Sequence, residues 1–115
     1  MIPLRVHAII DYLVGLLLLV APYLFGFATG EIEQVLPQVL GVLTLVMSLI
    51  TRYDLSIAKI IPVPIHLGVD AVAGVLLAAS PWLFGFADVI WWPHVLVGVV
   101  EILVVVLTRR HPSPV

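Results

Sequence analysis

The chain has 115 residues, of which 63% are hydrophobic and 10% are charged, and its formal net charge is −2. Average soluble domains are about 45–50% apolar and about 25% charged, and a soluble fold this small has too little interior to hide so much apolar surface. The negative net charge argues against a nucleic-acid partner. The absence of cysteine excludes disulfides, thiolate metal sites and redox pairs. We therefore expect an integral membrane protein whose first partner is the lipid bilayer.

Four apolar segments follow one another along the chain. Their uncharged runs, with Glu101 as the one interruption, cover residues 12–30, 34–51, 71–87 and 89–108. Each run is close to the roughly 20 residues that cross a bilayer as a helix, and helices satisfy their own backbone groups in lipid. The predicted fold class is all-α with four transmembrane helices, at residues 5–26, 34–52, 64–85 and 91–109. The first segment is too long for a signal peptide, so we expect it to be retained as an anchor.

With these four spans, the acidic residues of the two short connections fall on one side of the membrane, and all the basic residues fall on the other: Arg5, Arg52, Lys59, Arg109 and Arg110. Positive charge is enriched in cytoplasmic loops. This pattern predicts a multi-pass protein of the plasma (inner) membrane with both termini cytoplasmic.

An internal repeat organises the chain. Residues 2–28 align with residues 61–87 with 13 of 27 positions identical, and Gly41 and Thr51 match Gly98 and Thr108 further on. Repeats are considered before any fold is assigned. We expect two tandem helical hairpins that point the same way through the membrane. The predicted division is a first repeat at 1–52, a cytoplasmic linker at 53–60, a second repeat at 61–109 and a tail at 110–115.

The most similar part of the two copies is an aromatic motif that follows a long apolar run. It reads Ser80-Pro81-Trp82-Leu83-Phe84-Gly85-Phe86 in the second copy and Ala21-Pro22-Tyr23-Leu24-Phe25-Gly26-Phe27 in the first. On this Ser-Pro-Trp motif and its echo, the chain resembles the SPW repeat family of small prokaryotic integral membrane proteins. The resemblance implies a membrane location and a two-helix repeat, and it carries no established activity.

The motif is interpreted as a helix terminator and an interfacial anchor. Proline removes a helical hydrogen bond, serine can bond back to a carbonyl one turn earlier, and glycine suits a helix C-terminus. Tryptophan and tyrosine favour the membrane–water interface. The alternative is a binding or gating element at the outer face. The residues assigned to this role are Pro22, Tyr23, Pro81, Trp82, Trp91 and Trp92.

A candidate ion site lies at the opposite end of the same helices. His7 and Asp11 recur as His66 and Asp70, and a spacing of four residues places each pair on one helix face. Ionisable residues inside membranes usually face the bundle interior and are often functional, which indicates a proton or cation site. The alternative is structural, because helix dipoles favour aspartate near a helix start and arginines at neighbouring helix ends offer it partners.

Glu101 is a further candidate, as the one acidic residue within the fourth span. It lies about 12 Å from the cytoplasmic end of its helix at 1.5 Å per residue, at the level of Asp11 and Asp70. With Thr44, its counterpart in the first repeat, these residues would form a polar layer in the inner half of the bundle. Both a functional carboxylate and a protonated interhelical contact remain open for Glu101. His94 lies on the same helix face, but no recognised ligand spacing is present, so no metal site is expected.

Three functions follow from these residues. The first is a small structural or accessory membrane subunit, with a second copy or another membrane protein as partner. The second is a small proton, cation or solute transporter or channel that uses the acidic layer. The third, an enzyme, is not expected, because the sequence contains no nucleophile–base arrangement, no cofactor motif and no catalytic residue.

Overall fold

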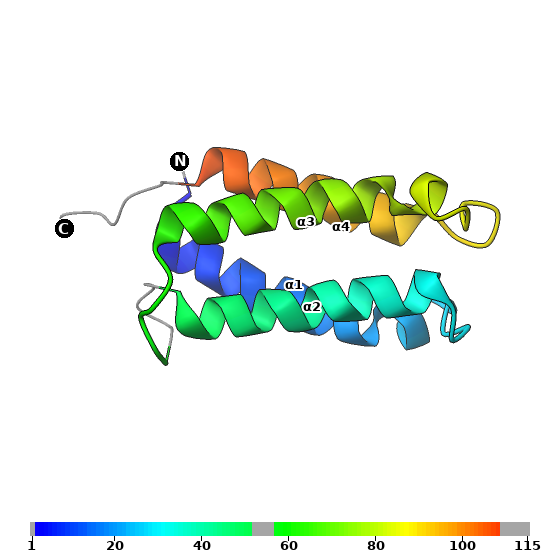
Figure 1. The fold of residues 1–115 in the computed structure, drawn as a ribbon, viewed down its shortest axis with the longest axis horizontal. Coiled ribbons are helices and arrows are strands. Elements are labelled where there is room, and N and C mark those ends of the chain that lie inside the picture. Colours follow the sequence, from blue (N-terminus) through cyan, green and yellow to red (C-terminus); the bar gives the residue numbers. More distant parts are fainter. Residues whose placement is uncertain (1, 52–56, 109–115) are drawn as a thin grey trace.

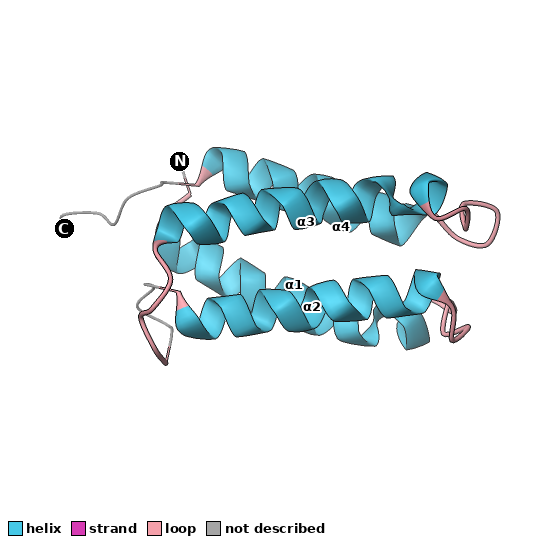
Figure 2. Ribbon diagram, in the orientation of Figure 1, coloured by secondary structure: helices cyan, strands magenta, loops and turns pink. Residues whose placement is uncertain are grey.

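The computed structural model describes residues 2–51 and 57–108, which form four helices (Figures 1 and 2). The helices are α1 (Leu4–Leu24), α2 (Ile32–Ile50), α3 (Val63–Leu83) and α4 (Trp92–Leu107). The first three are long and apolar enough to cross a membrane, and α4 is shorter, with 16 residues. The predicted all-helical membrane fold is confirmed, and each helix ends two residues before its predicted end.

Two helical hairpins lie side by side and point the same way. α1 and α2 form one hairpin, α3 and α4 form the other, and both hairpins turn at the same end of the bundle (Figure 1). We call this end, which holds the two aromatic motifs, the motif end, and the opposite end the linker end. Besides the contacts within each hairpin, α2 packs on α3 and α1 packs on α4. α1 and α3 therefore lie diagonally across the bundle.

Within each hairpin the two helices touch at a pair of glycines. A Cβ atom built on Gly41 would lie 2.8 Å from the carbonyl oxygen of Gly15, and one built on Gly98 would lie 2.6 Å from that of Gly74. Small residues at such crossings let membrane helices approach until their backbones are in contact. The close approach brings α4, and with it Glu101, against α3.

The aromatic motifs coincide with the ends of α1 and α3. Gly26 and Gly85, just past the helices, have φ angles of 78° and 74°, a left-handed conformation that glycine adopts without steric cost. Pro81 has no N–H for the carbonyl of Leu77, and the Ser80 hydroxyl donates to that carbonyl at 2.7 Å. The serine of the motif thus satisfies the group that the proline leaves unpaired.

α4 begins at Trp92, whereas the residue that aligns with the first residue of α2, Ile32, is Val89. Pro93 occupies the first turn of α4, where its missing N–H costs no hydrogen bond. The preceding residues turn instead, and the N–H groups of Val89 and Ile90 both donate to the carbonyl of Phe86. This turn shortens α4 at the motif end and leaves its other end level with that of α2.

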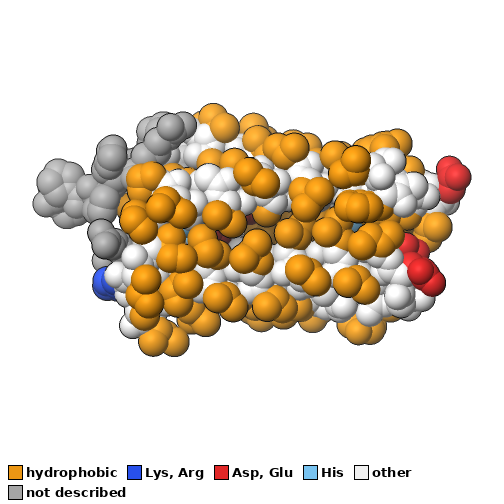
Figure 3. Space-filling model, viewed as in Figure 1, with side chains coloured by type: hydrophobic (Ala, Val, Ile, Leu, Met, Phe, Trp, Pro, Cys, Tyr) orange, Lys and Arg blue, Asp and Glu red, His pale blue; other side chains and the backbone are white. Residues whose placement is uncertain are grey.

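The face of the bundle drawn in Figure 3 is apolar along its length, with charged side chains at its two ends. Acidic side chains lie at the motif end, where Glu31 and Asp88 are exposed, and Lys59 is exposed near the linker end. Because large apolar side chains along the helices are left uncovered, the flank of the bundle suits a hydrocarbon environment. Residues 53–56 of the predicted linker, the tail at 110–115, Arg52 and Arg109 lie outside the described residues.

Candidate functional site

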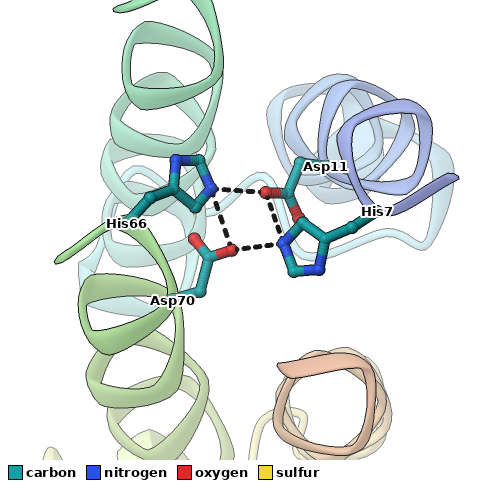
Figure 4. A group of neighbouring side chains, drawn as sticks. All are labelled: His7, Asp11, His66 and Asp70. Carbon is teal, nitrogen blue, oxygen red and sulfur yellow. Dashed lines mark hydrogen bonds and ion pairs between the residues drawn. The ribbon is translucent and has the colours of Figure 1, made fainter. Parts of the chain in front are cut away.

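Two histidines and two aspartates meet in the interior of the bundle, near the linker end (Figure 4). We call His7, Asp11, His66 and Asp70 the quartet. The side chains of all four are at most 2% exposed. His66 Nε2 lies 2.6 Å from Asp11 Oδ2 and 3.0 Å from Asp70 Oδ2, and His7 Nε2 lies 3.0 Å from each of the same two oxygens.

Each histidine pairs with an aspartate of its own helix and with one of the other hairpin. The i, i+4 spacing brings His7 to Asp11 and His66 to Asp70 on α1 and α3. The diagonal placement of these helices then turns both pairs toward the bundle axis, so that the pairs close into a ring (Figure 4). The quartet therefore links the two hairpins through their side chains.

Two threonines at the ends of α2 and α4 hold the outer edges of the imidazoles. Thr51 Oγ1 and Thr108 Oγ1 donate to backbone carbonyls one turn earlier in their own helices. Each hydroxyl proton is thereby used, so each threonine oxygen must accept from the histidine Nδ1 that faces it, at 2.6 Å for His66 and 2.8 Å for His7. Both Nδ1 atoms thus carry hydrogen, and both Nε2 atoms face the aspartates.

This hydrogen-bond pattern sets what the quartet can hold. A neutral imidazole with hydrogen on Nδ1 has a lone pair on Nε2, and that lone pair would face carboxylate oxygens. The close N···O distances are favourable only when a proton or another cation lies between the atoms. With a second proton on each imidazole, the two cationic rings and two carboxylates are neutral overall, as buried charges need to be.

Glu101 lies beside the quartet and is 5% exposed. It interacts electrostatically with both Asp11 and Asp70. A Cβ atom built on Gly74 would lie 3.4 Å from the Cβ atom of Glu101. Its two carboxyl oxygens have no hydrogen-bond partner among the described residues. Together with Thr44 it lines a cavity of about 10 Å³ whose other walls are mostly apolar. The predicted polar layer is thus resolved into a quartet and an adjacent, unpaired carboxyl group.

His94 has a separate position toward the motif end. Pro37 lies inside α2 and cannot donate to the carbonyl of Glu33, and His94 Nε2–H donates to that carbonyl at 2.9 Å. The ring lies between Phe27 and Phe86, with centroids 5.0 and 4.8 Å away. His94 therefore satisfies a backbone group in the opposite hairpin and does not reach the quartet.

The side chains assigned to the motif lie at the end of the bundle far from the quartet. Tyr23 and Trp82 are 67% and 61% exposed, and Trp91 and Trp92 are also exposed, whereas Pro22 and Pro81 are buried. Trp82 and Trp91 are within ring-contact distance of each other. The aromatic side chains and the quartet therefore lie toward opposite ends of α1 and α3.

Sequence reasoning placed the two aspartates near helix starts, where the helix dipole would favour them. In the structure neither lies in the first turn, so pairing across the hairpins replaces the dipole as the reason for their position. Thr51 and Thr108 were missed as site residues. Their signal was present, since they are an identical pair in the two halves of the sequence.

The comparisons agree with this architecture. The model of the SPW repeat domain matches residues 5–108, so the chain belongs to the SPW repeat family. No curated protein and no solved structure is significantly similar to it. The family match and the apolar helices make the chain a membrane protein and leave its activity open.

Proposed function

We propose that this chain is a small structural or accessory membrane protein, without enzymatic activity, whose quartet locks two helical hairpins into one unit. One observation carries the proposal: each quartet histidine bonds both an aspartate and a threonine of the opposite hairpin. The buried charges are matched to one another, which is the arrangement expected of a structural contact.

The cavities beside the site support the same function. The cavity at Glu101 and Thr44 measures about 10 Å³, room for about one water molecule. A second cavity of about 10 Å³ lies toward the motif end and is lined by apolar side chains and His94. Spaces of this size do not accommodate a hydrated ion or a small solute, so the bundle interior between Glu101 and His94 suits a packed membrane element better than a conduit.

The proposed setting is the plasma (inner) membrane with both termini cytoplasmic. Exposed acidic residues at the motif end and exposed Lys59 near the linker end support this orientation under the positive-inside rule. A second copy or another membrane protein is the proposed partner, which would pack on the apolar flank of the bundle (Figure 3).

Replacement of the aspartates tests the structural role. Asp11→Asn and Asp70→Asn each keep the shape of the side chain but remove its charge, which leaves the two histidines with one counter-ion between them. Breaking a buried ion pair in this way costs about 3–5 kcal/mol. Asp88→Asn, at an exposed acid of the motif end, is the matched control and should change stability by less than about 0.5 kcal/mol. Detergent-induced unfolding followed by circular dichroism measures both, and equal stability of all three variants would refute the role.

A second function, proton or cation transfer, is favoured by one observation: the Glu101 carboxyl group is buried beside the quartet and has no hydrogen-bond partner in the part of the chain that the structure describes. The two small cavities share the walls Leu18, Leu77 and Val97, so they mark a line from Glu101 toward His94. Proton flux into liposomes that contain the wild type or Glu101→Gln decides between the functions. If the chain has only the structural function, liposomes with the wild type and liposomes with Glu101→Gln should both show the same proton flux as protein-free liposomes. Flux that requires Glu101 would establish transfer instead.

A further inference from the structure

The inward-facing atoms of the quartet form a donor set typical of a transition-metal site. Two imidazole nitrogens and two carboxylate oxygens all lie within 4.8 Å of one another (Figure 4). Tetrahedral zinc bonds of about 2.0–2.2 Å separate their donors by about 3.3–3.6 Å. The histidine–aspartate atom pairs lie 2.6 to 3.0 Å apart, so these distances would have to lengthen by about 0.3–1.0 Å to seat the ion.

The threonines supply the outer contacts that metal-binding histidines need. A histidine that ligates through one ring nitrogen almost always donates its other N–H to a fixed acceptor, which sets the tautomer and the ring orientation. Thr51 and Thr108 are such acceptors, because their own protons are used in their helices. Both imidazoles are therefore held with Nε2 directed at the centre of the quartet.

Charge and unpaired oxygens point to the same ligand. Two neutral imidazoles and two carboxylates carry two negative charges, which a divalent cation neutralises inside an apolar bundle. As an independent observation, Asp11 Oδ1 and both oxygens of Glu101 have no hydrogen-bond partner among the described residues, although these residues are at least nine-tenths buried. A cation would place positive charge next to these oxygens.

We infer that the quartet binds one divalent transition-metal ion, with Zn²⁺ the best match to two imidazoles and two carboxylates. Mg²⁺ and Ca²⁺ prefer six or more oxygen ligands, which a buried site with two imidazoles does not offer. The inference goes beyond the structural role, which protons on the imidazoles alone could fulfil. The two ideas therefore fail separately: absence of metal binding would leave the quartet as a structural contact.

Cobalt is the probe, because four-coordinate Co²⁺ absorbs visible light far more strongly than hydrated Co²⁺. The tag-free full chain in detergent micelles is titrated with CoCl₂ and then with ZnCl₂ as competitor. We expect one Co²⁺ per chain with an intense visible band that zinc abolishes. A wild-type protein that gives only the pale spectrum of hydrated cobalt would overturn the inference.

Variants locate the ion. Asp70→Asn and His66→Gln should abolish the band, and His94→Gln, at a buried histidine outside the quartet, should keep it. Thr108→Val leaves all four ligands in place but removes an outer contact, so it should weaken binding about 10–100-fold. If the ligand variants do not fold, Thr108→Val decides, because unchanged affinity there would place the ion elsewhere. A band that survives Asp70→Asn would overturn the site as well.

Discussion

Replacing Gly98 by alanine tests the contact that sets the distance between α3 and α4. A Cβ atom at this position would lie 2.6 Å from the amide nitrogen of Ala78 and 2.6 Å from the carbonyl oxygen of Gly74, whereas ordinary contacts begin at 3.4 Å. The overlap is therefore 0.8 Å (3.4 − 2.6). Both atoms belong to the backbone, so no side-chain rotation can relieve it and the helices must move apart.

The cost follows from this displacement. A gap of about 0.5–1 Å removes a quarter to a half of the attraction between contacting atoms, and inserting a methyl group into a packed core costs about 1–3 kcal/mol. Alanine recovers about 0.5–1 kcal/mol as the better helix former. Because little else can adjust, we expect the upper part of the range, a net loss of about 2 kcal/mol. Glu101, one turn further along α4, would be displaced with the helix.

Gly68→Ala is the matched control, because a Cβ atom on Gly68 has no atom within 4 Å. Here alanine should stabilise α3 by about 0.5–1 kcal/mol. Both variants are compared with the wild type by unfolding in mixed detergent micelles, with helicity followed by circular dichroism. If Gly98→Ala proves as stable as Gly68→Ala, the helices do not touch as described and the reasoning is wrong.

Three further predictions concern groups outside the glycine contact. Ser80→Ala should lower stability by about 1 kcal/mol in the same unfolding assay, because the Leu77 carbonyl loses its donor; unchanged stability would contradict this contact. His94→Leu should cost about 1–3 kcal/mol by leaving the buried Glu33 carbonyl unpaired, and His94→Gln should cost less because it keeps a donor, so equal losses would argue against the hydrogen bond. The tryptophan fluorescence comes from Trp82, Trp91 and Trp92, which are all exposed at the motif end. Lipids brominated near the headgroup should quench it more than lipids brominated near the end of the acyl chain. The opposite order would place the motif end deep in the bilayer.

Much of the fold followed from local sequence features. The four helices required only apolar runs of spanning length, and the ends of α1 and α3 followed from Pro81 and Gly85 and the corresponding residues of the first hairpin. Such signals act within a few residues along the chain, so they can be recognised without knowledge of what packs where. α4 begins at Trp92, one residue after its predicted start, and Pro93 in its first turn is the local signal for that start.

The residues of the candidate site were predictable from the sequence, but the pairs that they form across the two hairpins were not. The spacing of His7 and Asp11, repeated at His66 and Asp70, placed each pair on one face of a helix. The sequence also placed Asp11 and Asp70 in one polar layer, but the pairing of each histidine with the aspartate of the other hairpin depends on α1 and α3 lying diagonally in the bundle. The role of Thr108 likewise depends on a residue distant in the chain, His7, whose Nδ1 it accepts from.

The amino-acid sequence by itself determined the membrane character, the helical hairpins and the residues that carry charge into the bundle, because these depend on hydrophobicity and short-range spacing. The tertiary structure decided that the charges are matched across the two hairpins and that both Nε2 atoms face inward. It also placed Glu101 beside them with no hydrogen-bond partner within residues 2–51 and 57–108. These features depend on helix packing distances set by glycine contacts such as Gly74 with Gly98. They are the features that distinguish a set of buried polar residues from a site able to hold a cation.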